Sequence, residues 1–207
     1  MLAVNASTAR CDGLGMFEGH GDIGKAGRSG SVEYDAAKGA YTISGGGADM
    51  WGAADAFHYL YKQASGDVKM TADIRWISEG GEKNRKACVI VRQNLEPGSP
   101  YVDAASHGDG HVDIQWRTAD DGKSGDAGAK GISHPKTIGI EKRGEEFQML
   151  AAVEGGELQP AGKPFKLHLE EPFYIGLGVC PHDDAALATV EFSNVTIDLS
   201  GGGHGSK

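Results

Sequence analysis

The sequence alternates between apolar and polar residues with a period of two along nearly its whole length. Short alternating runs are separated by clusters of Gly, Pro, Asn and Asp, which are typical of turns between strands. The clearest run, residues 67–77, places one set of apolar side chains on a single side: Val68, Met70, Ala72, Ile74 and Trp76. Such alternation indicates a strand with one buried and one wet face, and no stretch has the period of an amphipathic helix. The chain is therefore predicted to be all-β.

Twelve strands are predicted, enough for two packed antiparallel sheets. They span residues 31–34, 40–44, 57–63, 67–77, 87–93, 101–107, 111–118, 136–143, 146–153, 165–169, 173–179 and 188–199. The glycine-rich stretches 45–47, 80–81 and 155–156 are predicted to be loops. Residues 120–131 are predicted to form a long connection, either a rim beside a ligand surface or an ordinary excursion.

Residues 101–117, YVDAASHGDGHVDIQWR, are predicted to form a β-hairpin with a three-residue turn at Gly108, Asp109 and Gly110. In that register the strands pair as His107 with His111, Ala105 with Asp113, Asp103 with Gln115, and Tyr101 with Arg117. The other face then carries the apolar side chains, with Ser106 as the polar exception: Val102, Ala104, Val112, Ile114 and Trp116. A two-residue turn would scatter polar and apolar residues over both faces. The polar face is therefore predicted to meet a ligand.

The charge balance restricts the class of ligand. The 207 residues carry a formal net charge of −9 with a pI near 5.3, which disfavours a nucleic-acid partner. Neutral or cationic ligands fit better. The basic clusters at residues 83–86 and 142–143 are interpreted as solvated loop or strand edge. No apolar run approaches the roughly 20 residues of a membrane-spanning helix.

The three cysteines, Cys11, Cys88 and Cys180, contain no CxxC pair, which argues against a zinc or iron–sulfur site. One disulfide between two of them and three separate thiols remain alternatives. Residues 1–21 are predicted to be an N-terminal extension that could remain after cleavage of a signal peptide. Residues 22–199 are predicted to form the sandwich, and 200–207 a flexible tail.

Several segments of the sequence together resemble a known domain. They are GSVEYDAAKGAYTISGGGADMWGAADAFHYLYKQASGDVKMTADI, RKACVIVRQ, SPYVDAASHGDG, IGIEKRGEEFQM, PFYIGLGVCPHDD and VEFSNVTI. This succession resembles the concanavalin A-like (laminin G-like) jelly roll of bacterial envelope proteins, which sometimes precedes a TolB-type β-propeller. The resemblance covers residues 22–199 and implies a two-sheet antiparallel jelly-roll sandwich. It also implies a periplasmic or secreted location and a protein partner in the envelope as expectations, and it is compatible with binding modules and enzymes alike.

The catalytic motifs of known sandwich enzymes and serine hydrolases are incomplete or absent in this sequence. Laminarinase-type sandwich glycosidases share a Glu-x-Asp-x-x-Glu or Glu-x-Asp-x-Glu strand, and Glu33 and Asp35 lack the third carboxylate. No Gly-x-Ser-x-Gly elbow of a serine hydrolase is present. Alginate-lyase-like sandwiches use Arg, Gln, His and Tyr on the concave sheet, for which Arg92, Gln115, His107 and Tyr101 are candidates, with Tyr59 as the other tyrosine. The motifs that surround these residues in the lyases are not matched.

Two kinds of metal site are hypotheses. A structural Ca²⁺ at the sheet edge could use four aspartates, Asp183, Asp184, Asp22 and Asp198. The alternative for Asp183 and Asp184 is that they only form a turn. A transition metal could instead bind His107, His111 and Asp103, although a hydrogen-bonded polar face is the preferred interpretation of these residues. No other cofactor is implied.

A sugar site needs planar aromatic rings and side chains that make paired hydrogen bonds to hydroxyls. The candidates for both roles are Trp51, His58, Tyr59, Arg92, Tyr101, Asp103, His107, Asp113, Gln115 and Arg117. Trp51 stands among glycines, where a loop could present it, whereas Trp76 and Trp116 are predicted to be core. The leading hypothesis is a module that binds an oligo- or polysaccharide. The alternatives are a carbohydrate-active enzyme on the same face, either a lyase or an atypical glycosidase, and a protein-interaction domain.

Overall fold

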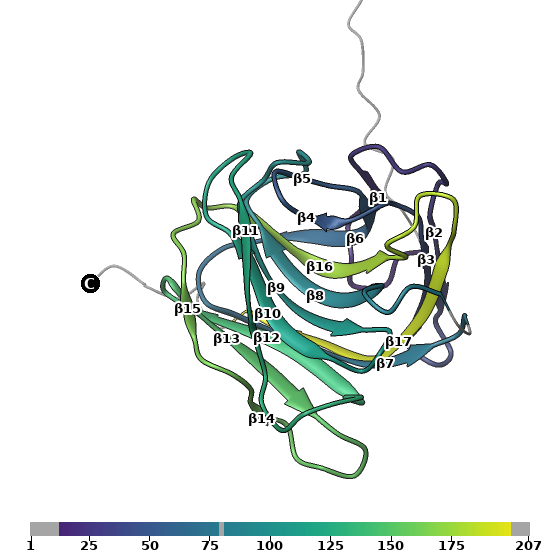
Figure 1. Ribbon diagram of the computed structural model, residues 1–207. Coiled ribbons are helices and arrows are strands. Elements are labelled where there is room, and N and C mark those ends of the chain that lie inside the picture. The colour runs from purple at the N-terminus through teal and green to yellow at the C-terminus, as the bar shows by residue number, and fades with distance from the viewer. Residues whose placement is uncertain (1–12, 79–80, 200–207) are drawn as a thin grey trace, which may run out of the picture.

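Two antiparallel sheets stack face to face in the computed structural model, which describes residues 13–78 and 81–199 (Figure 1). The seven-stranded sheet contains, in spatial order, β1 (Gly19–Ile23), β6 (Phe57–Ala64), β16 (Phe173–Cys180), β8 (Lys86–Arg92), β9 (Tyr101–His107), β10 (Val112–Arg117) and β11 (Ser124–Gly128). The eight-stranded sheet contains β14 (Gln159–Pro160), β13 (Glu146–Ala152), β12 (Thr137–Arg143), β7 (Val68–Trp76), β17 (Ala188–Asp198), β3 (Ala40–Gly45) and β2 (Ser31–Asp35), with β15 (Phe165–Lys166) beside β13. The predicted all-β sandwich is confirmed.

The hydrophobic core lies between the two sheets and follows from the alternation of the strands. On β7, Val68, Met70 and Ala72 are buried in the core, while the outward Arg75 is exposed. From the other sheet, Val102 and Ile114 enter the same core. Trp76 and Trp116 pack against this core as predicted. Leu14 and Phe17 also belong to it, although they precede the start predicted for the sandwich.

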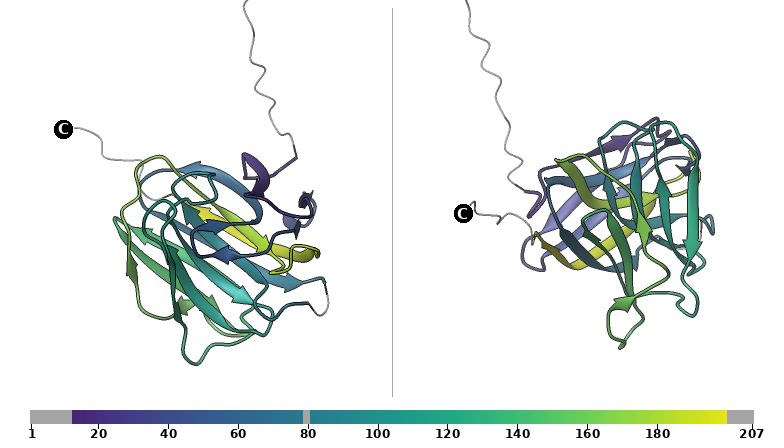
Figure 2. Two further views of the ribbon diagram at one scale, coloured as in Figure 1. Left: turned by 45° about the horizontal axis from the view of Figure 1, so that its top comes forward. Right: turned by 90° about the vertical axis from the view of Figure 1, so that its left-hand side faces the viewer.

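A small hairpin, β4 (Met50–Trp51) and β5 (Ala54–Asp55), lies on the other face of the seven-stranded sheet. Figure 1 and Figure 2 show it in the hollow of this sheet, on the side away from the eight-stranded sheet. Met50 is fully buried there among Phe57, Tyr59 and Ile90, which form a second apolar cluster. The hairpin therefore covers part of the concave face.

All twelve predicted strands are present, with ends that differ by up to three residues, and five further strands were not predicted: β1, β4, β5, β11 and β14. The prediction of a long loop at 120–131 was wrong, because β11 runs through it and pairs with β10 along five residues. Its sequence, SGDAG, has no apolar alternation that would predict a strand. An edge strand can form without this pattern, because main-chain hydrogen bonds to the neighbouring strand stabilise it.

Cys88 and Cys180 are free and buried, so neither takes part in a disulfide, and Cys11 lies outside the described residues. The described residues contain no helix, and hence none long and apolar enough to cross a membrane.

Burial raises the pKa of the Cys88 thiol well above its usual range and that of Cys180 to about 12. Because the thiolate is the reactive form, a Cys11→Ser variant is expected to resist iodoacetamide in its native state at about pH 8 and to take up two equivalents after unfolding. Mass spectrometry checks this, and rapid native alkylation would contradict it.

Candidate functional site

The polar hairpin of β9 and β10 has the predicted register. Ala105 pairs with Asp113, Asp103 with Gln115, and Tyr101 with Arg117, and the amide of His107 donates to the carbonyl of His111 over 2.8 Å. The polar side chains lie on the concave face of the seven-stranded sheet. Most of this face is not open, however, because the β4–β5 hairpin and residues 93–99 cover it.

Asp55 of that hairpin forms a buried clamp with two arginines of the sheet. Arg117 makes a bidentate contact with the Asp55 carboxylate, at 2.6 and 2.9 Å, and Arg92 adds a third contact at 3.3 Å. All three side chains are fully buried. The remaining guanidinium donors reach main-chain carbonyls, among them Gly52 from Arg117 and Asn94 from Arg92. Arg92 and Arg117, predicted to meet a ligand, therefore have partners within the protein and do not line an open pocket.

Three further candidates are also occupied inside the protein. Tyr101 is fully buried and donates to the Met50 carbonyl over 3.2 Å, and Tyr59 donates to the Ile90 carbonyl over the same distance. His58 is 2% exposed and lies between Asp22, at 2.7 Å, and His20, at 3.0 Å. Burial lowers the pKa of His58, although the contact with Asp22 opposes this. These side chains do not line the open pocket described below.

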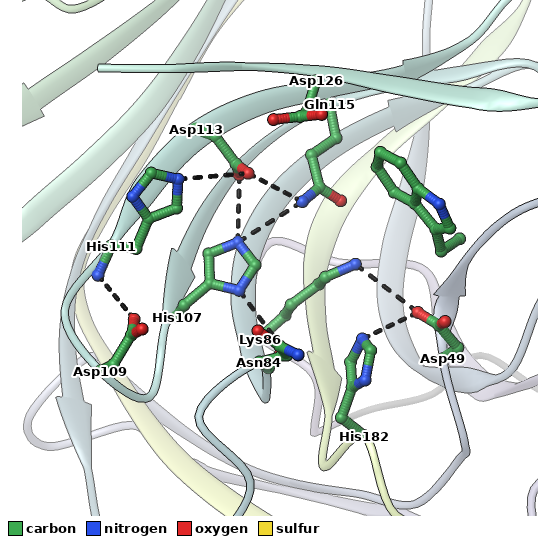
Figure 3. A pocket seen from close by; sticks show the side chains of 11 residues that line it. Asp49, Asn84, Lys86, His107, Asp109, His111, Asp113, Gln115, Asp126 and His182 are labelled. Atoms are coloured by element: carbon green, nitrogen blue, oxygen red, sulfur yellow. Dashed lines mark hydrogen bonds and ion pairs between the residues drawn. The ribbon is translucent and has the colours of Figure 1, made fainter. Parts of the chain in front are cut away.

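A pocket of about 370 Å³ remains open at the other end of the concave face (Figure 3). Of the predicted ligand-binding residues it brings together four: Trp51, His107, Asp113 and Gln115. Its other lining residues are Asp49, Asn84, Lys86, Asp109, His111, Asp126 and His182. Trp51 is 38% exposed and lies on β4, not in a loop. The pocket combines one accessible aromatic ring with many polar groups.

One wall of the pocket is a connected set on β9 and β10. Asp113 lies 3.1 Å from His107 Nε2 and accepts a 3.0 Å hydrogen bond from Gln115 Nε2. The other ring nitrogen of His107 lies 3.3 Å from the carbonyl of Asn84. Both ring nitrogens of His107 thus face protein acceptors. The residues predicted for a lyase are not brought together, because Arg92 and Tyr101 lie outside the pocket.

The opposite wall is held by Asp49. Its carboxylate lies 2.8 Å from His182 Nε2 and 3.8 Å from Lys86 Nζ. Burial would raise the pKa of Asp49, but the hydrogen bond and charge of His182 and the charge of Lys86 outweigh it and lower that pKa. Lys86 also donates to the Met50 carbonyl over 3.1 Å and lies 5.7 Å from the centre of the Trp51 ring. These contacts fix the position of Trp51 at the pocket.

Asp103 lies on the same face but is fully buried, and neither of its oxygens has a hydrogen-bond partner among the described residues. Burial raises its pKa well above the ordinary value, with Asp113 and Asp55 adding to the effect and Lys86 opposing it. Burial therefore favours the neutral form of this carboxyl. Asp103 does not line the open pocket.

Asp49, Lys86, Asp126 and His182 are among the pocket residues that sequence reasoning missed. Lys86 was assigned to a solvated basic cluster, whereas it is 2% exposed and points along the concave face. Asp126 was assigned to a loop, and only its pairing with Gln115 places it at the pocket. No feature of the local sequence distinguishes these residues, because each reaches the pocket through strand pairing or a distant turn.

The predicted calcium ligands have other partners. Asp22 binds His58 and the amide of Gly30, Asp183 accepts from the amide of Ala185 in its own turn, and Asp184 accepts from the amide of Gly27. Asp198 lies at the end of β17. Within residues 13–78 and 81–199, no group of three His, Cys, Asp or Glu side chains is placed to hold a metal. The alternative set of His107, His111 and Asp103 is likewise not assembled.

Comparisons with known proteins place the fold. No family model matches the sequence, and no curated protein matches it. A functionally unknown protein from Saccharomyces cerevisiae has a similar structure, with TM-score 0.63, 16% identity, and coverage of 83% of this chain and 93% of that one.

Two enzymes have similar structures. Alginate lyase A1-II′, of polysaccharide lyase family 7, has TM-score 0.53 and 12% identity over 82% of this chain and 83% of its own. A prokaryotic β-1,3-1,4-glucanase (lichenase) from a mouse hindgut metagenome has TM-score 0.50 and 13% identity over 91% and 97%. At these identities the likeness concerns the fold alone. With the two sheets and their topology, it shows that this chain has the fold of a concanavalin A-like jelly-roll sandwich.

Proposed function

We propose that the protein binds a carbohydrate in the open pocket of its concave face. The observation that carries this is the position of Trp51, a partly exposed aromatic ring at a pocket whose other walls are paired polar side chains. An aromatic plane stacks on a sugar ring, and fixed polar groups bind its hydroxyls. The solved neighbours with the same fold include proteins named as an alginate lyase and a β-1,3-1,4-glucanase, which supports the same class of ligand.

Binding is favoured over catalysis by the state of the candidate catalytic groups. A general base needs a nitrogen or oxygen that can reach the substrate proton, and both nitrogens of His107 already face protein acceptors. The tyrosine and arginine of the lyase hypothesis are buried beneath the β4–β5 hairpin.

An export location and an envelope partner stay predictions of the sequence resemblance.

Titrating the protein with neutral, amino and uronic oligosaccharides while following tryptophan fluorescence tests the proposal. At least one class is expected to quench the emission, and Trp51→Ala is expected to weaken its binding by about thirtyfold, as for a central aromatic contact. Calorimetry measures the affinity of the variant directly.

Trp76→Phe is the matched control, because Trp76 lies in the eight-stranded sheet and does not line this pocket. Its affinity is expected to equal that of the wild type. Unchanged binding in Trp51→Ala would refute the site, and absence of binding across the panel would refute the function. Release of new reducing ends or unsaturated products would show an enzyme instead.

A further inference from the structure

The pocket has an excess of negative charge. Four aspartates and one lysine line it, and the described residues place no arginine there. The lysine is already used, because Lys86 Nζ contacts the Met50 carbonyl at 3.1 Å and lies 3.8 Å from Asp49. Asp49 and Asp113 are paired with His182 and His107. Among the described residues that line the pocket, no lysine or arginine is therefore left free to meet a ligand.

Asp126 is the acidic group most available to a ligand. It lies on the edge strand β11, is exposed, and makes no side-chain hydrogen bond or ion pair with other described residues. The strand register places it directly beside Gln115 of β10. Cross-strand neighbours lie about 5 Å apart on one face, so a group bound by Asp126 also lies next to Gln115.

The side-chain oxygen of Gln115 is independent evidence that the pocket accepts a ligand with a hydrogen-bond donor. Asp113 is an acceptor, so the hydrogen bond between them requires the amide nitrogen of Gln115 to face Asp113. Its Oε1 is then turned away from Asp113 (Figure 3) and has no hydrogen-bond partner among the described residues, although Gln115 is only 3% exposed. A buried acceptor without a donor costs free energy. A donor or positive charge bound at the pocket would offset that cost.

We infer that the pocket selects a sugar with a free, protonated amine over neutral sugars and uronates, with the ammonium group between Asp126 and Gln115. This inference rests on the proposed carbohydrate function and names its ligand class. The Asp126 carboxylate attracts the ammonium group, and the Gln115 carbonyl presents the negative end of its dipole to it. The nearby Trp51 ring adds a favourable face for a cation. A uronate carboxylate would meet like charge instead.

Four β-1,4-linked tetramers that differ only in their substituents test the selection: those of glucose, glucosamine, N-acetylglucosamine and glucuronic acid. Calorimetry at about pH 5.5, where the amine of a 2-amino sugar is largely protonated although its neighbouring oxygens hold its pKa below that of a simple primary amine, is expected to show the glucosamine tetramer binding at least about tenfold more tightly than the glucose tetramer. Acetylation is expected to remove the advantage, and added salt to reduce it.

Asp126→Asn keeps the shape of the side chain and is expected to reduce the ratio of the two affinities to about one. Asp120→Asn, which removes the same charge at an exposed position outside the pocket, is expected to keep the wild-type ratio. Equal affinities for the amine and neutral tetramers, or tighter binding of the glucuronate, would overturn the inference and leave carbohydrate binding intact. If none of the tetramers and no other panel sugar binds, both proposals fail.

Discussion

Replacing Asp55 by alanine is expected to lower the free energy of unfolding by about 3–5 kcal/mol, because it leaves two guanidinium groups buried without their shared anion. Arg92 and Arg117 are both fully buried, and Asp55 is the carboxylate that contacts them. Since single domains are stable by about 5–15 kcal/mol, this is a large fraction of the total. Urea unfolding followed by circular dichroism gives the value.

Asp55→Asn gives a second test if the alanine variant does not fold, since it keeps the shape and removes only the charge. The control is Glu154→Ala, which breaks the exposed ion pair with Lys136 and is expected to cost less than about 1 kcal/mol. Because Asp55 belongs to the same hairpin as Trp51, ligand binding is expected to weaken in the Asp55 variants as well. A loss of stability no larger than that of the control would show that the clamp is not needed.

Asp103→Asn is expected to remove a decline in stability that the wild type shows as the pH rises. Burial raises the pKa of Asp103 in the folded state above its ordinary value of 3.8, so the folded protein holds this proton more tightly than the unfolded chain. The stabilisation is complete below the unfolded pKa and is lost as the pH rises from there through the folded pKa. The expected slope is up to about 1.4 kcal/mol per pH unit within that window.

The measurement is the free energy of unfolding of both proteins at several pH values between about 4 and 8, from which the difference isolates Asp103. Asparagine cannot ionise, so the variant is expected to be the more stable protein at the alkaline end. Asp120→Asn, at an exposed position, is expected to give a curve parallel to the wild type. Parallel curves for Asp103→Asn and the wild type would show that Asp103 does not hold its proton.

The register of the polar hairpin could be predicted because it depends on local information. The apolar residues of β9 and β10 must share one face, which a three-residue turn at Gly108–Gly110 achieves and a two-residue turn does not. What the polar face contacts could not be predicted in the same way. Polar side chains are normally predicted to face solvent. Arg92 and Arg117 are buried instead, because both contact Asp55, and this partner lies 37 and 62 residues earlier in the chain.

The sequence by itself determined the all-β sandwich, the twelve main strands and the inner faces of β7, β9 and β10, since period-two alternation directly expresses which side of a strand is buried. Only the tertiary structure decided where a ligand can enter. A hairpin from residues 50–55 fills one end of the concave face and presents Trp51 at the other, and β11 brings Asp126 beside Gln115. These contacts join segments far apart in sequence through main-chain pairing and buried charge, neither of which leaves a periodic pattern in the residues involved.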